Sequence, residues 1–109
     1  MNMYDFVEAV RGRGIVVIRL SEQVHALVNT ECDGSEGVLF ARYPESFYKH
    51  GYFEEPPEDL DRDIVKKAIK KIRYAVDELN EDNAYETSLG RLTTKEIRTA
   101  LDEFSERAE

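Results

Sequence analysis

The side chains best suited to nucleophilic or acid–base chemistry are few. There is one cysteine, Cys32, and there are two histidines, His25 and His50. A lone cysteine forms no internal disulfide, and no cysteine and histidine framework for structural zinc is present. The sequence also lacks an HExxH motif, a glycine-rich phosphate loop and a serine-centred elbow. We therefore expect no catalytic residue and no cofactor, and we expect Cys32 to be a partly buried thiol in a reducing compartment.

Adjacent carboxylates are a second candidate for chemistry, because paired acids can bind a divalent cation. Such pairs occur at Glu54 and Glu55 and at Asp59 and Asp61. They flank a double proline and precede a predicted helix, where acids commonly act as caps and as solubilising residues. The calcium-loop pattern of alternating oxygen ligands around a central glycine is missing elsewhere in the chain. The sequence therefore predicts no metal site.

The charges are arranged in blocks, and this is the most specific feature of the sequence. The segment 54–61 carries a net charge of −5, the segment 62–73 carries +5, and the segment 77–86 carries −5. At helical spacing, the cations of the middle segment cover the side opposite an apolar stripe. They form either a basic ridge that meets phosphates or an acidic patch on a partner protein, or simply the solvated face of a core helix. These cations are Arg62, Lys66, Lys67, Lys70, Lys71 and Arg73.

Aromatic residues gather in an irregular segment between residues 40 and 53, with Lys49 and His50 among them. Tyrosines are frequent anchors of protein interfaces, and aromatic rings also stack on nucleic-acid bases. The alternative is that the phenylalanines fill the core beneath a loop while the tyrosine hydroxyls face water. We predict a partner-binding surface that combines these tyrosines with the adjacent acids. Its residues are Tyr43, Tyr48, Tyr52, Glu54, Glu55 and Asp59.

Several short elements must position these side chains. Apolar spacing predicts a short helix over residues 4–10, which Gly12 and Gly14 end. Residues 15–20 are rich in β-branched side chains, which predicts a strand. Apolar and other side chains alternate over residues 24–29, which predicts a second strand with one buried face. Residues 38–43 are predicted to form a third strand. Short connections favour an antiparallel meander of these three strands. A single helical turn fits residues 45–50.

The strongest pattern is a long amphipathic helix at about residues 60–79, with apolar residues at spacings of three and four. Residues 80–90 are expected to form a linker. A final helix is predicted from a capping box at Thr93 and Glu96 and a hydrophobic staple between Leu92 and Ile97.

The predicted fold is α+β: a three-stranded antiparallel sheet (about 15–43) packed against the long helix, with short N-terminal and C-terminal helices. The chain has 109 residues, of which 41% are hydrophobic, and this fits a single globular domain over residues 1–109. No segment resembles a signal peptide, and no apolar run is long enough to span a bilayer. We therefore expect a cytoplasmic protein with no membrane association.

The net charge of −8 opposes whole-surface attraction to nucleic acid. Together with the absence of catalytic motifs, it favours a small acidic, non-enzymatic protein that occludes a macromolecular partner, as inhibitors, immunity proteins and phage anti-defence proteins do. That partner would be a protein or a protein–nucleic-acid complex. One alternative is direct nucleic-acid binding through the basic helix face. Another is a homodimer or larger accessory assembly formed through the helix stripe or a free sheet edge.

Overall fold

The strands form one mixed sheet, whose order follows the chain. The computed structural model describes residues 7–11, 14–43, 45–48, 62–86, 88–89 and 91–108. Neighbouring strands are antiparallel from β1 to β4, and β5 is parallel to β4. The five strands are β1 (Val7–Arg11), β2 (Ile15–Ser21), β3 (Val24–Asn29), β4 (Val38–Ala41) and β5 (Ser88–Leu89).

The three predicted strands are present as β2, β3 and β4, and they pair as the expected antiparallel meander. β-Branched side chains fit the pleated, buried surface of β2. A two-residue turn at Glu22 and Gln23 joins β2 to β3. The α+β class is therefore confirmed, but the sheet is larger than the predicted three strands.

The predicted N-terminal helix over residues 4–10 is wrong for the part that the structure describes, because Val7–Arg11 is a strand. Val10 lies opposite Val16, and Arg11 lies opposite Ile15. A helix of so few residues gains little by itself, since nucleation is costly. Pairing with the edge of β2 instead satisfies the backbone of this segment. Residues 4–6 lie outside the described part of the chain.

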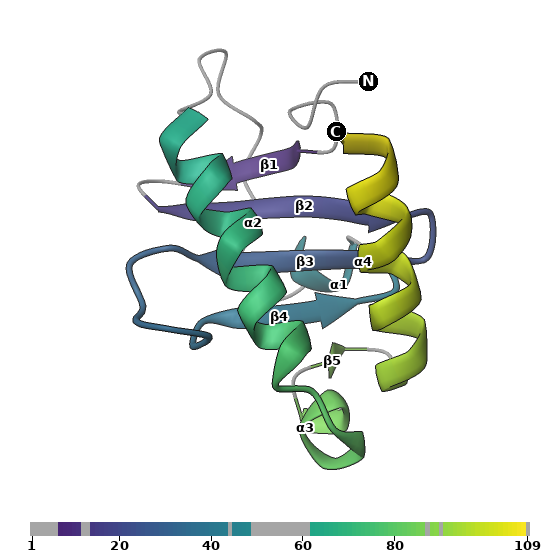
Figure 1. Cartoon of the computed structure of the whole chain (residues 1–109). Helices are drawn as coiled ribbons and strands as arrows, with labels where there is room; N and C mark the ends of the chain where they lie inside the picture. Colours follow the sequence, from purple (N-terminus) through teal and green to yellow (C-terminus); the bar gives the residue numbers. More distant parts are fainter. Residues whose placement is uncertain are drawn as a thin grey trace.

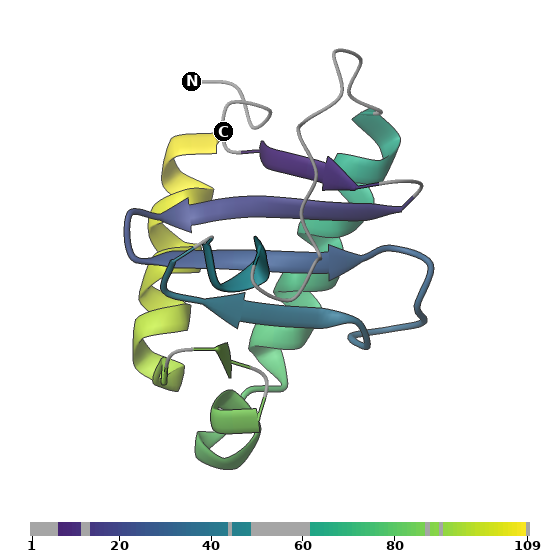
Figure 2. The ribbon, with the colours of Figure 1, turned by 180° about the vertical axis from the view of Figure 1, so that it is seen from behind.

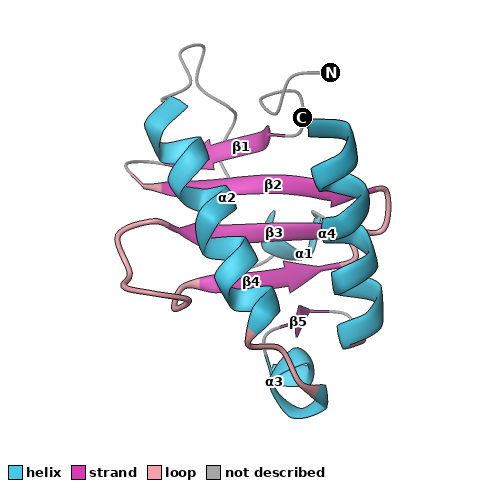
Figure 3. Ribbon diagram, viewed as in Figure 1, coloured by secondary structure: helices cyan, strands magenta, loops and turns pink. Residues whose placement is uncertain are grey.

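The helices are α1 (Glu45–Tyr48), α2 (Arg62–Asp77), α3 (Glu81–Glu86) and α4 (Thr94–Ala108). Three helices follow the first four strands along the chain, and α4 follows β5; Figure 3 shows α2 and α4 lying across the strands. α2 is the predicted long helix, and α4 begins at the predicted capping box: Glu96 N donates to Thr93 Oγ1 (3.1 Å), and Thr93 N donates to Glu96 Oε1 (3.4 Å). The predicted long helix and C-terminal helix are therefore both present, although α4, with 15 residues, is not the short helix expected.

The expectation of a plain linker over residues 80–90 is wrong, because this stretch contains α3 and β5. The start of α3 is closed by reciprocal bonds, in which Asn83 N donates to Asn80 Oδ1 (2.9 Å) and Asn80 N donates to Asn83 Oδ1 (2.7 Å). A short helix closed by such local side-chain bonds need not show a periodic apolar pattern, so the sequence carries no signal for it. β5 pairs only through Ser88 and Leu89, which is too short a run to predict from alternation.

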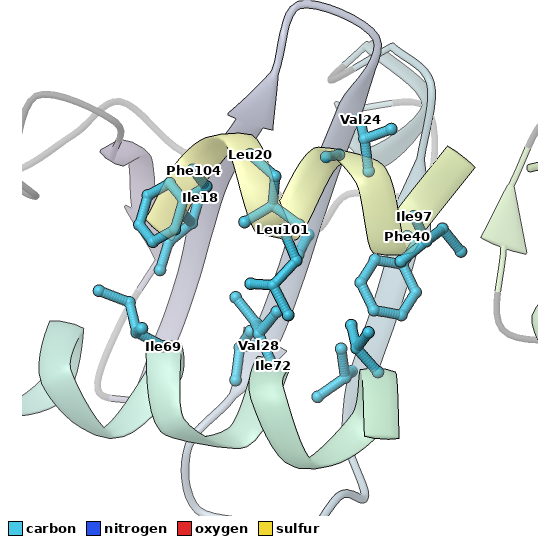
Figure 4. Close-up of a cluster of buried hydrophobic side chains, with 14 of the residues drawn as sticks. Ile18, Leu20, Val24, Val28, Phe40, Ile69, Ile72, Ile97, Leu101 and Phe104 are labelled. Carbon is cyan, nitrogen blue, oxygen red and sulfur yellow. The ribbon is translucent and has the colours of Figure 1, made fainter. Parts of the chain in front are cut away.

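The main core lies between the sheet and the two long helices, which cross the same face of the sheet (Figure 1). Figure 4 shows that side chains from the strands, from α2 and from α4 meet in this core. The strands supply Ile18, Leu20, Val24, Val28 and Phe40, α2 supplies Ile69 and Ile72, and α4 supplies Ile97, Leu101 and Phe104.

The opposite face of the sheet is also covered, and α1 lies over it (Figure 2). Phe47 of α1 is fully buried against Val17, Leu27 and Ala41. β3 is consequently buried on both faces, and the prediction that residues 24–29 have only one buried face is wrong. The phenylalanine at position 47 is a core residue, as one of the two sequence interpretations proposed.

Candidate functional site

α2 presents its polar side to solvent because its apolar stripe is fully used by the core. Val65, Ala68, Ile72 and Val76 are almost completely buried against the sheet. This stripe is not available to a second copy of the chain, so that route to a dimer is excluded. The other route, pairing through a sheet edge such as β1, stays a prediction, which light scattering would test.

Five of the six predicted cations lie on the exposed outer face of α2: Arg62, Lys66, Lys67, Lys70 and Arg73. Two exposed carboxylates, Asp63 and Asp77, belong to the same helix. Five cations less two carboxylates leave a net charge of +3 among the exposed residues of α2, within a chain of net charge −8. The basic face predicted from the sequence therefore exists as a surface feature.

Lys71 does not belong to this face, and its assignment to the exposed ridge is wrong. Its side chain is only 5% exposed. The Nζ atom donates to the carbonyl oxygens of Cys32 (2.8 Å) and Gly34 (2.6 Å) in the loop between β3 and β4. At helical spacing, position 71 borders the apolar stripe rather than the centre of the polar side, and the loop lies within reach of a lysine.

Tyr74 is a member of the exposed face that the sequence interpretation missed. Half of its surface is exposed (50%), and Lys70 Nζ lies 5.9 Å from the centre of its ring. That distance permits a cation–π contact. The sequence signal was available, since Tyr74 follows Lys70 by four residues and Lys67 by seven and therefore shares their side of the helix. We use the name outer face of α2 for Arg62, Lys66, Lys67, Lys70, Arg73 and Tyr74.

The order of charges along α2 is mixed with respect to the helix dipole, because Asp63 in the first turn is favourably placed and other charges are not. Arg62 lies in the first turn, near the positive end of the helix dipole, and no basic residue lies in the last turn. Asp77 and Glu78 lie at the negative end. Each misplaced charge costs about 0.3–1 kcal/mol at low ionic strength. Asp63 also precedes Lys67 by four residues, the favoured order for a pair of opposite charges, so only part of the charge arrangement opposes the helix.

The predicted tyrosine and acid surface is only partly described. Tyr43 is 59% exposed and follows Arg42 at the end of β4. Tyr48 is the last residue of α1, for which the structure describes the backbone position. Tyr52, Glu54, Glu55 and Asp59 lie outside the described residues. Whether these six residues form one surface stays a prediction.

An open cleft of about 500 Å³ lies between the β2–β3 turn and α4. At its wall, Arg42 Nη1 donates to Gln23 Oε1 (3.0 Å), and Arg42 Nη2 donates to Glu96 Oε2 (2.7 Å). Hydrogen bonding from Arg42 is the main reason that the pKa of Glu96 lies below its ordinary value of 4.5, with smaller help from Thr93. Arg107 Nη2 donates to Leu20 O (3.0 Å) in the same region. These guanidinium groups therefore hold α4 to the sheet.

The described residues contain no group of three or more histidine, cysteine, aspartate or glutamate side chains that could hold a metal ion. His25 is buried in β3, in register with Arg19 of β2 and Ala41 of β4. Cys32 lies in the loop after β3 and is partly buried, as expected. His50 lies outside the described residues.

Comparison with known proteins finds no matching family model, no similar curated protein and no similar solved structure. In the described part of the chain, the helices are all too short or too polar to cross a membrane. The outer face of α2 is the largest exposed cluster of like charge within one described helix, and its geometry and charge indicate a binding surface.

Proposed function

We propose that this chain is a non-enzymatic binding protein that acts by occluding a surface of a macromolecular partner. The observation that carries the proposal is the outer face of α2, where an exposed tyrosine lies among five exposed cations. Inhibitors, immunity proteins and phage anti-defence proteins act by covering a partner in this way, and the proposal places the chain in that functional class by analogy of size and charge.

The outer face suits binding because it is already held in position. α2 is fixed to the sheet by its buried stripe, and the Lys71 ammonium joins it to the β3–β4 loop. A surface that does not need to order on binding loses less conformational entropy when the complex forms. Tyrosine contributes large contact area with few rotatable bonds, and it is enriched at the centres of interfaces.

Tyr43 supports a second contact point. It is the most exposed large hydrophobic residue among those described, and it lies at the end of β4 on the polypeptide that leads into α1. An exposed tyrosine by itself is common on protein surfaces. In this proposal, Tyr43 and the tyrosines and acids that follow it make a separate contact, because Tyr43 leads into α1 on the face of the sheet opposite α2.

Direct nucleic-acid binding is the second candidate, and one observation favours it. Arg62, Lys66 and Lys70 follow one another at four-residue spacing and are all exposed. Such a row can neutralise successive phosphates, and the affinity would then fall steeply with added salt. The net charge of −8 opposes this candidate because it repels a polyanion at longer range.

Affinity purification of the tagged chain from the cells that produce it tests the proposed function. The expected result is a macromolecular partner that elutes with the chain at a constant ratio and loses one of its own activities or contacts in the complex. If the chain elutes alone at every salt concentration, or if the bound partner keeps all its other contacts, the proposal is wrong. Nuclease treatment before elution separates a protein partner from nucleic acid.

A further inference from the structure

The geometry points to a partner class: we propose that the outer face of α2 docks a short acidic segment of a protein. This inference rests on the proposed function and names the chemistry of the partner. The residues that make the contact are Lys66, Lys67, Lys70 and Tyr74, with Arg62 and Arg73 at the ends. All of them are exposed and come from one rigid helix.

The extent of the outer face sets the size of the segment. Arg62 and Arg73 are separated by a helical rise of roughly 16 Å, at about 1.5 Å for each residue. A partner helix of about eleven residues, or a shorter extended strand, covers this distance. The outer face of α2 is therefore long enough to contact a short linear segment of a partner, but not a whole domain.

The chemistry of the outer face requires carboxylates and apolar groups together. Lys66, Lys67 and Lys70 offer ammonium groups to carboxylates. The ring of Tyr74 and the methylene stem of Lys70, whose Nζ lies 5.9 Å from the ring centre, add apolar surface between these charges. A segment that alternates acidic with aliphatic side chains meets both demands.

The charges around the outer face favour a short acidic segment over a phosphate backbone. Four exposed carboxylates follow the C-terminal end of the face: Asp77, Glu78, Glu81 and Asp82. α2 as a whole carries six cations and two carboxylates, a net charge of +4, so the rest of the chain carries −12. DNA presents a charge about every 3.4 Å along each strand, so a bound duplex continues beyond the face and meets these carboxylates. A short segment ends before it reaches them.

Fluorescence anisotropy with defined probes tests the inference. The first probe is a labelled peptide of about twelve residues that alternates glutamate with leucine and alanine at helical spacing, which matches the length of the face. The second probe is the same peptide with each glutamate replaced by glutamine. The third probe is a labelled DNA duplex with as many base pairs as the peptide has residues. We expect the chain to bind the acidic peptide, with an affinity that falls as salt rises to about 0.15 M, and to bind the other two probes more weakly.

Three variants locate the contact. Tyr74→Ala and the double variant Lys66→Gln with Lys70→Gln are each expected to weaken peptide binding by about tenfold. Lys95→Gln, which removes an exposed cation from α4, is the control and should bind as the wild type does. Circular dichroism checks that each variant is folded, and the surface positions of these residues make unfolding an unexpected outcome.

Each other outcome overturns the inference. If the duplex binds more tightly than the acidic peptide, the outer face recognises nucleic acid instead. If the peptide does not bind at low salt, or if the α2 variants bind it like the control, acidic segments are not ligands of this face. In either case, a partner recovered by affinity purification would still support the proposed function. Failure of the acidic-segment inference can therefore be distinguished from failure of the proposed function.

Discussion

The ammonium group of Lys71 joins α2 to the loop between β3 and β4. Its Nζ donates to Cys32 O and Gly34 O, and Ser35 Oγ in the same loop donates to Glu78 Oε2 just after the helix. A buried charge is costly unless its hydrogen bonds are satisfied, and two carbonyl acceptors supply those bonds here. Lys71 therefore has a structural role and does not belong to the outer face of α2.

Lys71→Met is expected to destabilise the protein by about 1–3 kcal/mol, because the two loop carbonyls lose a charged donor. Lys67→Met is the matched control, since it removes an exposed lysine from the same helix. Its effect should stay within about 0.5 kcal/mol. Urea denaturation of the two variants measures the difference, and equal stabilities would show that the Lys71 contacts contribute nothing to folding.

Glu96 links the start of α4 to Arg42 at the end of β4, and this contact makes a small part of the stability depend on pH. Because the pKa of Glu96 is lower in the folded chain than its ordinary value of 4.5, its contribution is present above that value. The contribution is lost as the pH falls through the lower folded pKa. The side chains of Arg42 and Glu96 are 26% and 37% exposed, so solvent screening keeps the effect small.

Glu96→Gln should therefore reduce the free energy of unfolding by a few tenths of a kcal/mol at neutral pH. The wild type and the variant should converge as the pH is lowered well below 4.5, where Glu96 of the wild type is also protonated. Denaturant titrations of both proteins across this range measure the difference. A gap that stays constant with pH would show that the carboxylate charge is not the cause.

The loop between β3 and β4 shows how a single element depends on backbone geometry as well as on side-chain contacts. Gly37 and Gly34 both have positive φ angles (80° and 57°), which favour glycine. A Cβ atom at Gly37 would lie 2.9 Å from Cys32 Sγ and 3.1 Å from Asn29 O, whereas one at Gly34 would have no neighbour within 4 Å. The loop closes tightly at Gly37 and is open at Gly34.

Gly34→Ala is expected to cost about 1 kcal/mol, which is the cost of placing a side chain in the left-handed region. Gly37→Ala has the same backbone cost and adds a clash, so its loss of stability should be larger by about 1 kcal/mol or more. Thermal or chemical denaturation of both variants makes this comparison. The opposite order would mean that the close approach at Gly37 is relieved at little cost.

The elements that the sequence predicts well are those with a long or strongly patterned apolar signal. α2 and α4 carry repeated apolar spacing, and the capping box marks the start of α4. β1, α3 and β5 are short, and their pairing partners or local bonds lie outside any periodic pattern. The basic face was predictable from spacing, but the burial of Lys71 depends on a distant loop that helical spacing does not reveal.

At the scale of the whole molecule, charge is separated between one helix and the rest of the chain. α2 carries +4 and the remainder −12, so the chain meets a charged partner with a strongly uneven field. Electrostatic fields of this kind orient a partner before contact and speed association at low ionic strength. They also disfavour partners that present extended negative charge beyond the outer face of α2.

Partner retention during affinity purification of four matched proteins tests the central claim most directly. These are the wild type, Tyr74→Ala, the double variant Lys66→Gln with Lys70→Gln, and the control Lys95→Gln. The account predicts that the wild type and Lys95→Gln retain the same protein partner in equal amounts and that both α2 variants lose most of it. Equal retention by all four proteins, or no partner with the wild type, would contradict the claim that the outer face of α2 is a binding surface.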